Sequence, residues 1–259
     1  MITGASAGIG EEYALQLARR VPNIVLTARR AERLDQLAQR LRAEAPDTSV
    51  TVLPADLSDP DERASLLARM AALGIVPDVL INNAGVGDYG EFAGAAWPRI
   101  SPMLRLNIES LTHLAHALVP GMIASGGGAI VNVSSLAGEL PIPDFAVYAA
   151  TKAYVTSFSE ALRIELGGHG IRVIAVCPGP VHTEFGEIAR RPGGGRDIPR
   201  WWFFMPKERV VSESLAALER GRARVFPGKR TALAAAFISA MPVAWLRRAM
   251  SLRPRKSRG

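Results

Sequence analysis

Thr3-Gly4-Ala5-Ser6-Ala7-Gly8-Ile9-Gly10 opens the chain and decides its fold class. Three glycines at this spacing permit a tight turn and a close approach of the backbone to a pyrophosphate. A helix expected from Glu11 would point its free N–H groups and the positive end of its dipole at that phosphate. A glycine cluster alone also fits an ordinary turn. Its place ahead of a helix and a strand-helix-strand unit favours a phosphate loop.

Short β-branched and aliphatic runs alternate with helical patterns along the rest of the chain. The expected strands cover residues 23–28, 49–53, 78–82, 129–133 and 172–177. The expected helices cover residues 11–20, 31–44, 61–73, 97–118 and 149–166. The strand runs are almost continuously apolar, which is typical of a parallel sheet covered on both faces. We therefore expect a single α/β domain of the Rossmann type, with a doubly wound parallel sheet and helices on both faces.

Composition agrees with a globular protein of the reduced cell interior. The 259 residues are 48% hydrophobic and 21% charged, which excludes a disordered or a collagen-like chain. Cys177 is the only cysteine, so no intrachain disulfide forms and no cysteine-based zinc site is expected. Glycines occupy the place where a secretory signal would carry its apolar core, and we expect a cytoplasmic protein.

Charge is distributed unevenly along the chain. Residues 1–185 hold 14 basic and 19 acidic side chains, whereas residues 186–259 hold 17 basic and 5 acidic ones. A basic C-terminal quarter attracts phosphate groups, whether of nucleic acid or of acidic lipid. No interleaving of aromatic and basic residues accompanies it, so no nucleic-acid partner is expected.

Two arginines follow the strand after the glycine-rich loop. An acidic residue about 20 residues after such a loop would hold a ribose 2′-hydroxyl. The chain instead has Arg29 and Arg30 there, whose forked guanidinium groups suit a 2′-phosphate. NADP is therefore favoured over NAD as the cofactor. The alternative is that both arginines are solvated residues at the start of a helix.

A phenol and an ammonium group stand four residues apart at Tyr148 and Lys152, and a helix would place them on one face. A nearby cation favours phenolate, so the spacing predicts a lowered pKa for Tyr148. Ser135 precedes Tyr148 by 13 residues, at the end of an expected strand, where its hydroxyl could bind a substrate carbonyl. Asn107 lies in the preceding helix and would otherwise be read as a surface amide.

These motifs together resemble the short-chain dehydrogenase/reductase family, over roughly residues 1–185. The matching positions, in order, are residues 3–10, Asp56, Asn82-Asn83-Ala84-Gly85, Asn107, Ser135, Tyr148, Lys152 and Pro178-Gly179. Their order and spacing leave little room for chance. Within the family, the chain is loosely similar to steroid and 3-ketoacyl reductases in its segment 225–228.

The resemblance implies a catalytic set and a cofactor set. In the catalytic set, Tyr148 would donate or accept the proton, and Lys152 would lower its pKa and hold the nicotinamide ribose. Ser135, rather than Ser134, would hold the substrate oxygen, and Asn107 would hold a water of the proton relay. The cofactor set comprises Thr3, Gly4, Ser6, Gly8, Ile9, Gly10, Arg29, Arg30, Asp56 near the adenine, Leu57, Asn83, Ala84, Gly85, Tyr148, Lys152, Pro178, Gly179, Val181 and Thr183. No metal is implied, and His113 with His116 lacks a third ligand.

The chain departs from the family pattern at its start. A strand of about five residues should precede the glycine-rich loop, but only Met1 and Ile2 stand before Thr3. A lost central strand would leave backbone groups of its neighbours unpaired. The sequence therefore suggests that the natural chain begins upstream of Met1.

The C-terminal third carries the substrate side. Residues 1–230 are expected to form the catalytic domain, including a substrate loop at about 184–210. The aromatic run 201–205 either lines an apolar mouth or packs the loop, so a ketone or 3-ketoacyl substrate is favoured. Residues 231–259 form an uncharged segment, 231–246, and a basic tail. The uncharged segment fits a docked helix, an in-plane contact with a membrane surface, or a membrane span.

Three functions remain open on sequence alone. The first is an NADP-dependent oxidoreductase that exchanges a hydride with a carbonyl or secondary alcohol of an apolar small molecule. The second is a non-catalytic NADP-binding sensor on the same fold. The third is a membrane-associated scaffold that uses the basic C-terminus. A homodimer or homotetramer is expected from the family's habit.

Overall fold

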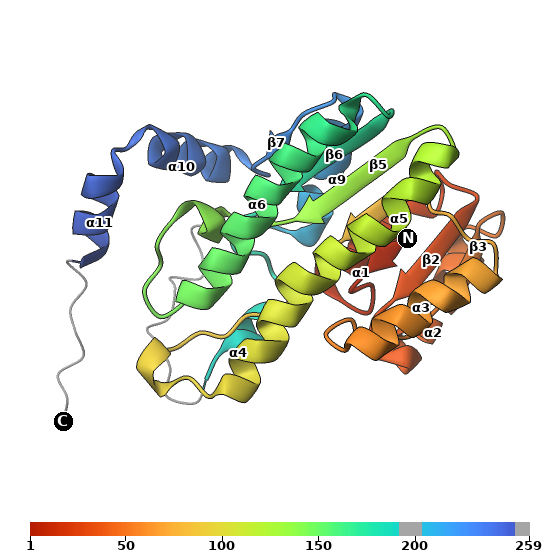
Figure 1. The fold of residues 1–259 in the computed structure, drawn as a ribbon, viewed down its shortest axis with the longest axis horizontal. Helices are drawn as coiled ribbons and strands as arrows, with labels where there is room; N and C mark the ends of the chain where they lie inside the picture. The colour runs from red at the N-terminus through yellow and green to blue at the C-terminus, as the bar shows by residue number, and fades with distance from the viewer. Residues whose placement is uncertain (192–203, 252–259) are drawn as a thin grey trace.

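A seven-stranded, all-parallel sheet forms the centre of the computed structural model, which describes residues 1–191 and 204–251 (Figure 1). The strand order is β3-β2-β1-β4-β5-β6-β7. The strands are β1 (Ile2–Thr3), β2 (Asn23–Thr27), β3 (Ser49–Val52), β4 (Val79–Asn82), β5 (Gly128–Val133), β6 (Ile171–Val176) and β7 (Arg224–Val225). The order reverses direction between β1 and β4, which is where ligands bind in open sheets of this kind.

Helices cover both faces of the sheet, and each face has its own core. One core joins α1 (Gly8–Leu17), α2 (Ala31–Glu44) and α9 (Lys207–Glu219) to the sheet through such residues as Tyr13, Leu37 and Val211. The other joins α3 (Pro60–Ala72), α5 (Leu111–Ala124) and α6 (Ala146–Gly167) through such residues as Leu66, Leu114 and Leu166. The predicted α/β class and doubly wound sheet are therefore confirmed.

The five predicted strands each lie within one residue of an observed strand, because continuous burial on two faces marks them clearly. The predicted helix at 97–118 is helical throughout and continues to Ala124, but it is not α-helical along its whole length. The structure divides this region into α4 (Trp97–Leu104), a π-helical turn η2 (Arg105–Ser110) and α5. A π turn changes which side chains face inward, and such turns are frequent at functional sites. This one contains Asn107.

The short first strand is paired on both sides. Ile2 lies opposite Leu26 of β2 and Ile81 of β4. The α-amino group of Met1 donates to the Val79 carbonyl at 2.7 Å, and the Ile81 amide donates to the Met1 carbonyl at 2.9 Å. Three residues thus tie the phosphate loop to the middle of the sheet.

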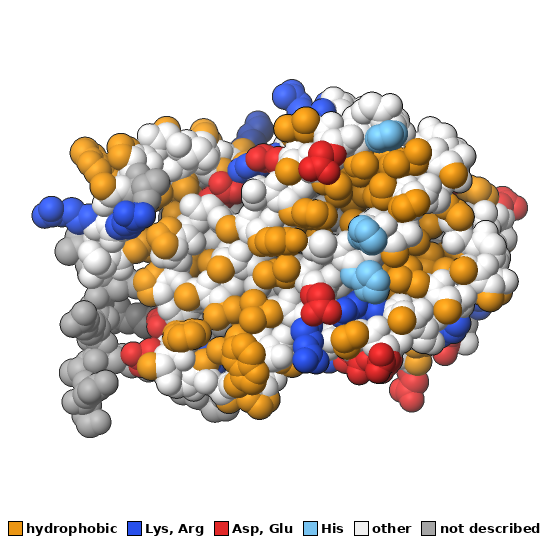
Figure 2. Space-filling view, viewed as in Figure 1, with side chains coloured by type: hydrophobic (Ala, Val, Ile, Leu, Met, Phe, Trp, Pro, Cys, Tyr) orange, Lys and Arg blue, Asp and Glu red, His pale blue; other side chains and the backbone are white. Residues whose placement is uncertain are grey.

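The uncharged segment at 231–246 is two helices rather than one. Helix α10 (Lys229–Ala240) buries Thr231 and Ala235, and α11 (Val243–Ser251) follows a break at Pro242. Leu233, Phe237 and Trp245 are exposed. In Figure 1 both helices extend away from the sheet, and Figure 2 shows hydrophobic and basic side chains together on this arm. Among the helices in the described ranges, none combines the length and apolar character that a membrane span requires.

Figure 2 also shows hydrophobic side chains spread over the face formed by α5 and α6. Tyr154 and Ile164 are among the exposed residues of α6. The expected self-association stays a prediction, as does contact of the C-terminal arm with a membrane surface. The part of the aromatic run at 201–203 lies outside the described residues.

Candidate active site

The phosphate loop has a geometry that only glycine permits at two of its positions. Gly4 and Gly8 have φ of 65° and 62°, in the left-handed region that favours glycine. A Cβ on Gly10 would lie 2.3 Å from the Gly4 carbonyl oxygen, so the first turn of α1 packs directly on the loop. The resulting backbone cradle at the start of α1 fits the pyrophosphate that the sequence predicts.

Thr3 and Asn83 hold the loop against the end of β4. The Thr3 hydroxyl accepts hydrogen bonds from the amides of Asn83 and Ala84 at 2.9 and 3.0 Å. The Asn83 side-chain amide donates to the Thr3 carbonyl at 2.9 Å and to the Gly4 carbonyl at 3.3 Å. These bonds join two motifs about 80 residues apart into one floor. The structure therefore brings together Thr3, Gly4, Asn83 and Ala84 as the resemblance implies.

Arg30 extends from the start of α2 to the rim of the phosphate loop. Its Nε donates to the Ser6 hydroxyl at 3.2 Å. Arg29 instead lies 3.7 Å from the Asp56 carboxylate, and the two form an exposed ion pair. Leu57 is buried in a core, and its carbonyl accepts a hydrogen bond from Arg63. Of the arginine pair, Arg30 is thus the one directed at the loop, while the side chain of Leu57 belongs to the core.

Tyr148 lies in the first turn of α6 within a group of aromatic rings. Its ring stacks on Phe145 with centroids 4.2 Å apart, and Phe185 of α7 (Phe185–Ala189) lies 5.3 Å from it. Phe145 in turn meets Tyr89 edge-on at 5.5 Å. The four rings make an apolar surface around the phenol. The sequence predicted a role only for Tyr148. Phe145 caps the same helix, α6, whereas Tyr89 and Phe185 come from separate segments that no local pattern connects to it.

Ser135 and Ser134 have different surroundings. The Ser134 hydroxyl is buried and hydrogen-bonded to the Lys152 carbonyl and to Thr156, both at 2.7 Å. Ser135 follows β5, and its hydroxyl accepts from the Ala137 amide at 3.1 Å and donates to the Pro178 carbonyl at 3.5 Å. Ser135 also acts on Tyr148, because it lowers the pKa of the phenol. Ser134 therefore ties β5 to α6, and Ser135 is the serine beside the phenol.

The pKa of Tyr148 is opposite to the prediction from its spacing to Lys152. Burial raises the pKa of Tyr148 to about 12, and the interaction with Ser135 offsets that rise only in part. Lys152 Nζ lies 5.7 Å from the centre of the Tyr148 ring and donates to the Val133 carbonyl at 2.8 Å. Desolvation of the phenol is the largest cause of the shift, and the Lys152 ammonium is not among its causes. Tyr148 therefore carries its proton at neutral pH, in the form that donates to a carbonyl oxygen.

Asn107 and Lys152 approach the same glycine. A Cβ on Gly85 would lie 3.3 Å from Asn107 Oδ1 and 3.4 Å from Lys152 Nζ. The buried Asn107 amide donates to the Val86 carbonyl at 2.9 Å and to Thr151 at 3.0 Å, and it accepts from the Val86 amide at 3.0 Å. The π turn thus fixes Asn107 between the β4 loop and α6. No sequence motif predicted a role for Thr151, whose hydroxyl accepts this hydrogen bond from Asn107.

Burial also lowers the pKa of Lys152, and this shift makes the stability of the fold depend on pH. Desolvation lowers the pKa of Lys152 from 10.5 to about 8. Between these values the unfolded chain binds more protons than the folded one, so the free energy of unfolding rises with pH. Between pH 8 and pH 10 the rise is roughly 2 kcal/mol, at up to about 1.4 kcal/mol per pH unit. We expect the rise in the free energy of unfolding to be absent from Lys152→Met. Urea denaturation of both proteins without cofactor, at pH 8 and at pH 10, measures this. Parallel pH dependence in both proteins would contradict this assignment.

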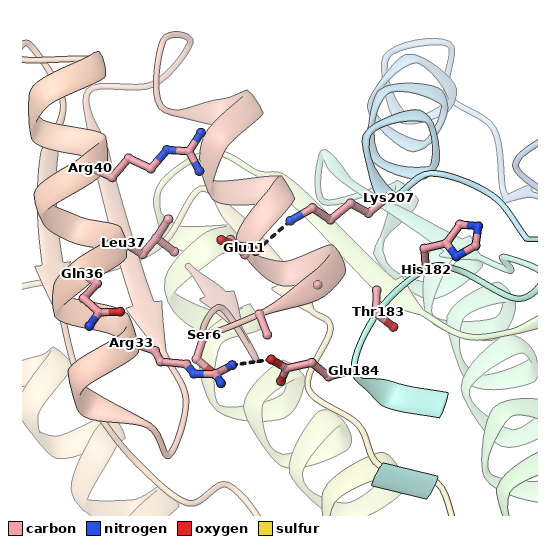
Figure 3. A pocket seen from close by; sticks show the side chains of 12 residues that line it. Ser6, Glu11, Arg33, Gln36, Leu37, Arg40, His182, Thr183, Glu184 and Lys207 are labelled. Carbon is pink, nitrogen blue, oxygen red and sulfur yellow. Dashed lines mark hydrogen bonds and ion pairs between the residues drawn. The ribbon is translucent and has the colours of Figure 1, made fainter. Parts of the chain in front are cut away.

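A cavity of ≈ 400 Å³ opens beside the phosphate loop, between α1, α2 and the segment after β6 (Figure 3). Thr183 lines it opposite Gly8, and a Cβ on Gly8 would lie 3.1 Å from Thr183 Cγ2. Arg33 and Glu184 also line it. Their ion pair is the one drawn near Ser6 in Figure 3. Helical spacing from Arg30 could have drawn attention to Arg33, but Glu184 is a long-range partner that no local pattern marks.

A buried carboxylate, Asp88, holds the loop that follows β4. Asp88, beyond the β4 loop, accepts from Arg99 Nε at 2.8 Å and from Arg191 Nε at 2.8 Å. The Arg191 bond holds the pKa of Asp88 below its usual range. A bridge between Tyr89 and Arg190 runs beside this network. The network fixes the far end of the α7 segment against the loop that carries Tyr89.

The arrangement places a proton-donating phenol, a hydroxyl and a buried ammonium beside a phosphate cradle. That set can bind a dinucleotide and protonate an oxygen close to it. Within residues 1–191 and 204–251, no group of three or more side chains could hold a metal ion. His113 instead accepts a hydrogen bond from Arg63 at 3.4 Å.

Comparisons with known proteins agree with this geometry. The family pattern described as short chain dehydrogenase matches residues 1–192. A sulfoacetaldehyde reductase of Chromohalobacter salexigens is 37% identical over 198 residues, which is 74% of this chain and 75% of that protein. A short-chain dehydrogenase of Sphingobium yanoikuyae, solved with NADPH, has TM-score 0.80 and 35% identity, covering 100% of this chain and 96% of that one. A bulky-bulky ketone specific alcohol dehydrogenase of Comamonas testosteroni has TM-score 0.78 and 31% identity, with coverage of 100% and 95%.

Proposed function

Since the chain belongs to the short-chain dehydrogenase/reductase family, we propose that it is an NADP-dependent carbonyl reductase or alcohol dehydrogenase for apolar substrates. It is an NAD(P)-dependent oxidoreductase of carbonyl and alcohol groups, as its relatives are. The observation that carries the proposal is the meeting of Tyr148, Ser135 and Lys152 at the carboxyl ends of β4 and β5, beside the phosphate loop.

Each side chain has a role that follows from its surroundings. The nicotinamide supplies or takes up the hydride when it is bound. Tyr148, protonated at neutral pH, donates its proton to the carbonyl oxygen in reduction and accepts it in oxidation. Ser135 donates a hydrogen bond to the same oxygen and orients the carbonyl. Lys152 is a cation next to the ring, which stabilises phenolate once the proton has left.

The preference for NADP rests on the charges at the phosphate loop. Arg30 bonds to Ser6, and Arg33 lies one helical turn further along α2. Two guanidinium groups at the rim suit the 2′-phosphate of NADP, because each can pair with its charge and its oxygens. The neutral 2′-hydroxyl of NAD offers no such partner. The relative from Sphingobium yanoikuyae was solved with NADPH, in line with this choice.

We expect Arg30→Ala to weaken NADPH binding selectively. Loss of one charge-assisted hydrogen-bond partner of the 2′-phosphate, at about 1.5 kcal/mol, should raise the Kd of NADPH about tenfold. The Kd of NADH should change by less than about twofold, because NADH has no group for Arg30 to bind. Fluorescence titration with both cofactors measures this. Equal losses for the two cofactors would mean that Arg30 acts on the loop structure instead.

The apolar surroundings of Tyr148 support a hydrophobic ketone as substrate. Phe145, Phe185 and Tyr89 form the surface next to the phenol. The relative from Comamonas testosteroni is specific for bulky ketones, whereas the one from Chromohalobacter salexigens reduces the small polar sulfoacetaldehyde. NADPH oxidation against bulky ketones, 3-ketoacyl thioesters and sulfoacetaldehyde tests the proposal. Turnover of sulfoacetaldehyde alone would reject the proposal of an apolar substrate, but the protein would still be a carbonyl reductase.

A further inference from the structure

A carboxylate of the chain itself occupies the arginine pair at the rim of the phosphate loop. Glu184 Oε2 accepts from Arg30 at 2.9 Å, and Glu184 Oε1 accepts from Arg33 at 2.7 Å. Arg30 holds Ser6 with its Nε at the same time. The Glu184 carboxylate therefore binds the two guanidinium groups that a phosphate would bind. Figure 3 shows this carboxylate directed toward Arg33, on the side where Ser6 lies.

Charge and exposure define how firmly this contact holds. Hydrogen bonds from Arg30 and then Arg33 hold the pKa of Glu184 below its usual range, so the carboxylate is ionised at neutral pH. The side chains of Glu184, Arg30 and Arg33 are 44%, 41% and 45% exposed. Ion pairs this exposed are weak and sensitive to salt, so another anion can displace the carboxylate.

We propose that Glu184 is a cofactor-specificity residue, which occupies the 2′-phosphate site in the free protein and must leave Arg30 and Arg33 when NADPH binds. The inference rests on the NADP preference of the proposed function. When a 2′-phosphate binds, it takes both guanidinium groups as partners, and Glu184 loses them. If Glu184 stayed in place, its carboxylate would repel the phosphate. Glu184 therefore lowers the affinity for NADPH while leaving that for NADH unchanged.

The position of Glu184 extends the effect to the active site. Glu184 directly precedes Phe185, whose ring lies 5.3 Å from the ring of Tyr148. At the other end of the same segment, Arg191 is bonded to the buried Asp88. The segment after β6 is thus tied to α2 at one end and to the substrate side at the other.

Glu184→Gln is the central test, because it removes the charge and keeps the shape of the side chain. We expect the Kd of NADPH at low salt to fall about three- to tenfold, or about 0.7–1.4 kcal/mol, because the exposed ion pairs that NADPH must displace are weak. The Kd of NADH should change by less than about twofold. The minimal probe adenosine 2′,5′-bisphosphate should gain affinity like NADPH, and 5′-AMP should not, since it has no 2′-phosphate.

Two further variants complete the design. Glu187→Gln removes an exposed carboxylate three residues further along α7 and should leave both affinities unchanged. Arg33→Ala should weaken NADPH binding, because the 2′-phosphate loses its second guanidinium. At high salt, screening should bring Glu184→Gln and wild type closer together.

The outcomes separate the two proposals. If wild type binds NADPH no better than NADH, the NADP preference of the proposed function fails, and the inference about Glu184 fails with it. If wild type prefers NADPH but Glu184→Gln leaves its Kd unchanged or raises it, the NADP preference stands. Glu184 is then no competitor but a group that positions the arginines, and the inference alone is overturned.

Discussion

Tyr148→Phe should abolish most turnover and leave the fold intact. General acid–base catalysis by a positioned side chain contributes about 10²- to 10⁴-fold to the rate. We expect kcat to fall by that factor, because Tyr148 is the phenol that lies beside Ser135 and Lys152. The ring contacts with Phe145 and Phe185 remain in the variant, so its melting temperature should stay close to that of wild type.

Cofactor binding is the control for this variant. Tyr148 is one of many expected contacts with the dinucleotide, and loss of one hydrogen bond, about 1 kcal/mol, should raise the Kd of NADPH no more than about fivefold. Steady-state NADPH oxidation and fluorescence titration are measured on the same preparations. Turnover retained in Tyr148→Phe would show that another group supplies the proton. Tight NADPH binding with no turnover in wild type for any carbonyl of the panel would favour the sensor.

Gly10→Ala should damage both the fold and the cofactor site. The added Cβ would lie 2.3 Å from the Gly4 carbonyl oxygen and 2.5 Å from Asn83 Nδ2. The first of these atoms is backbone, so the loop itself must move. Overpacking of this kind lowers the free energy of unfolding by about 1–3 kcal/mol. The displaced cradle should raise the Kd of NADPH by about tenfold or more, the effect of 1.4 kcal/mol.

Gly94→Ala is the matched control, since a Cβ on Gly94 meets no atom within 4 Å. Its stability should stay within about 0.5 kcal/mol of wild type, as for ordinary surface changes. Thermal unfolding of both variants, with and without NADPH, measures the two effects. Wild-type stability and NADPH affinity in Gly10→Ala would mean that the tight packing of α1 on the loop is absent in solution.

The sequence predicted most of what lies along single elements. The strands are continuous apolar runs, and the spacing of the glycines, Ser135, Tyr148 and Lys152 indicates their positions on a helix or at a strand end. Asn83 was identified by the family resemblance. The prediction of a lowered pKa for Tyr148 was wrong, because burial of the phenol sets that pKa. Spacing indicates that Lys152 is near Tyr148, but it does not show how much water surrounds the phenol. The structure raises the pKa of Tyr148 for that reason.

Local patterns in the sequence were enough to identify the class of chemistry, because the phosphate loop, the strands of a parallel sheet and the phenol with its ammonium partner each lie within one short segment. Only the tertiary structure decided which charges and rings face them. Glu184 lies 154 residues from Arg30, and Phe185 reaches Tyr148 from a segment beyond β6. The physical reason is that a local pattern records the periodicity of one element. Contacts between elements depend instead on how the two layers of helices pack on the sheet.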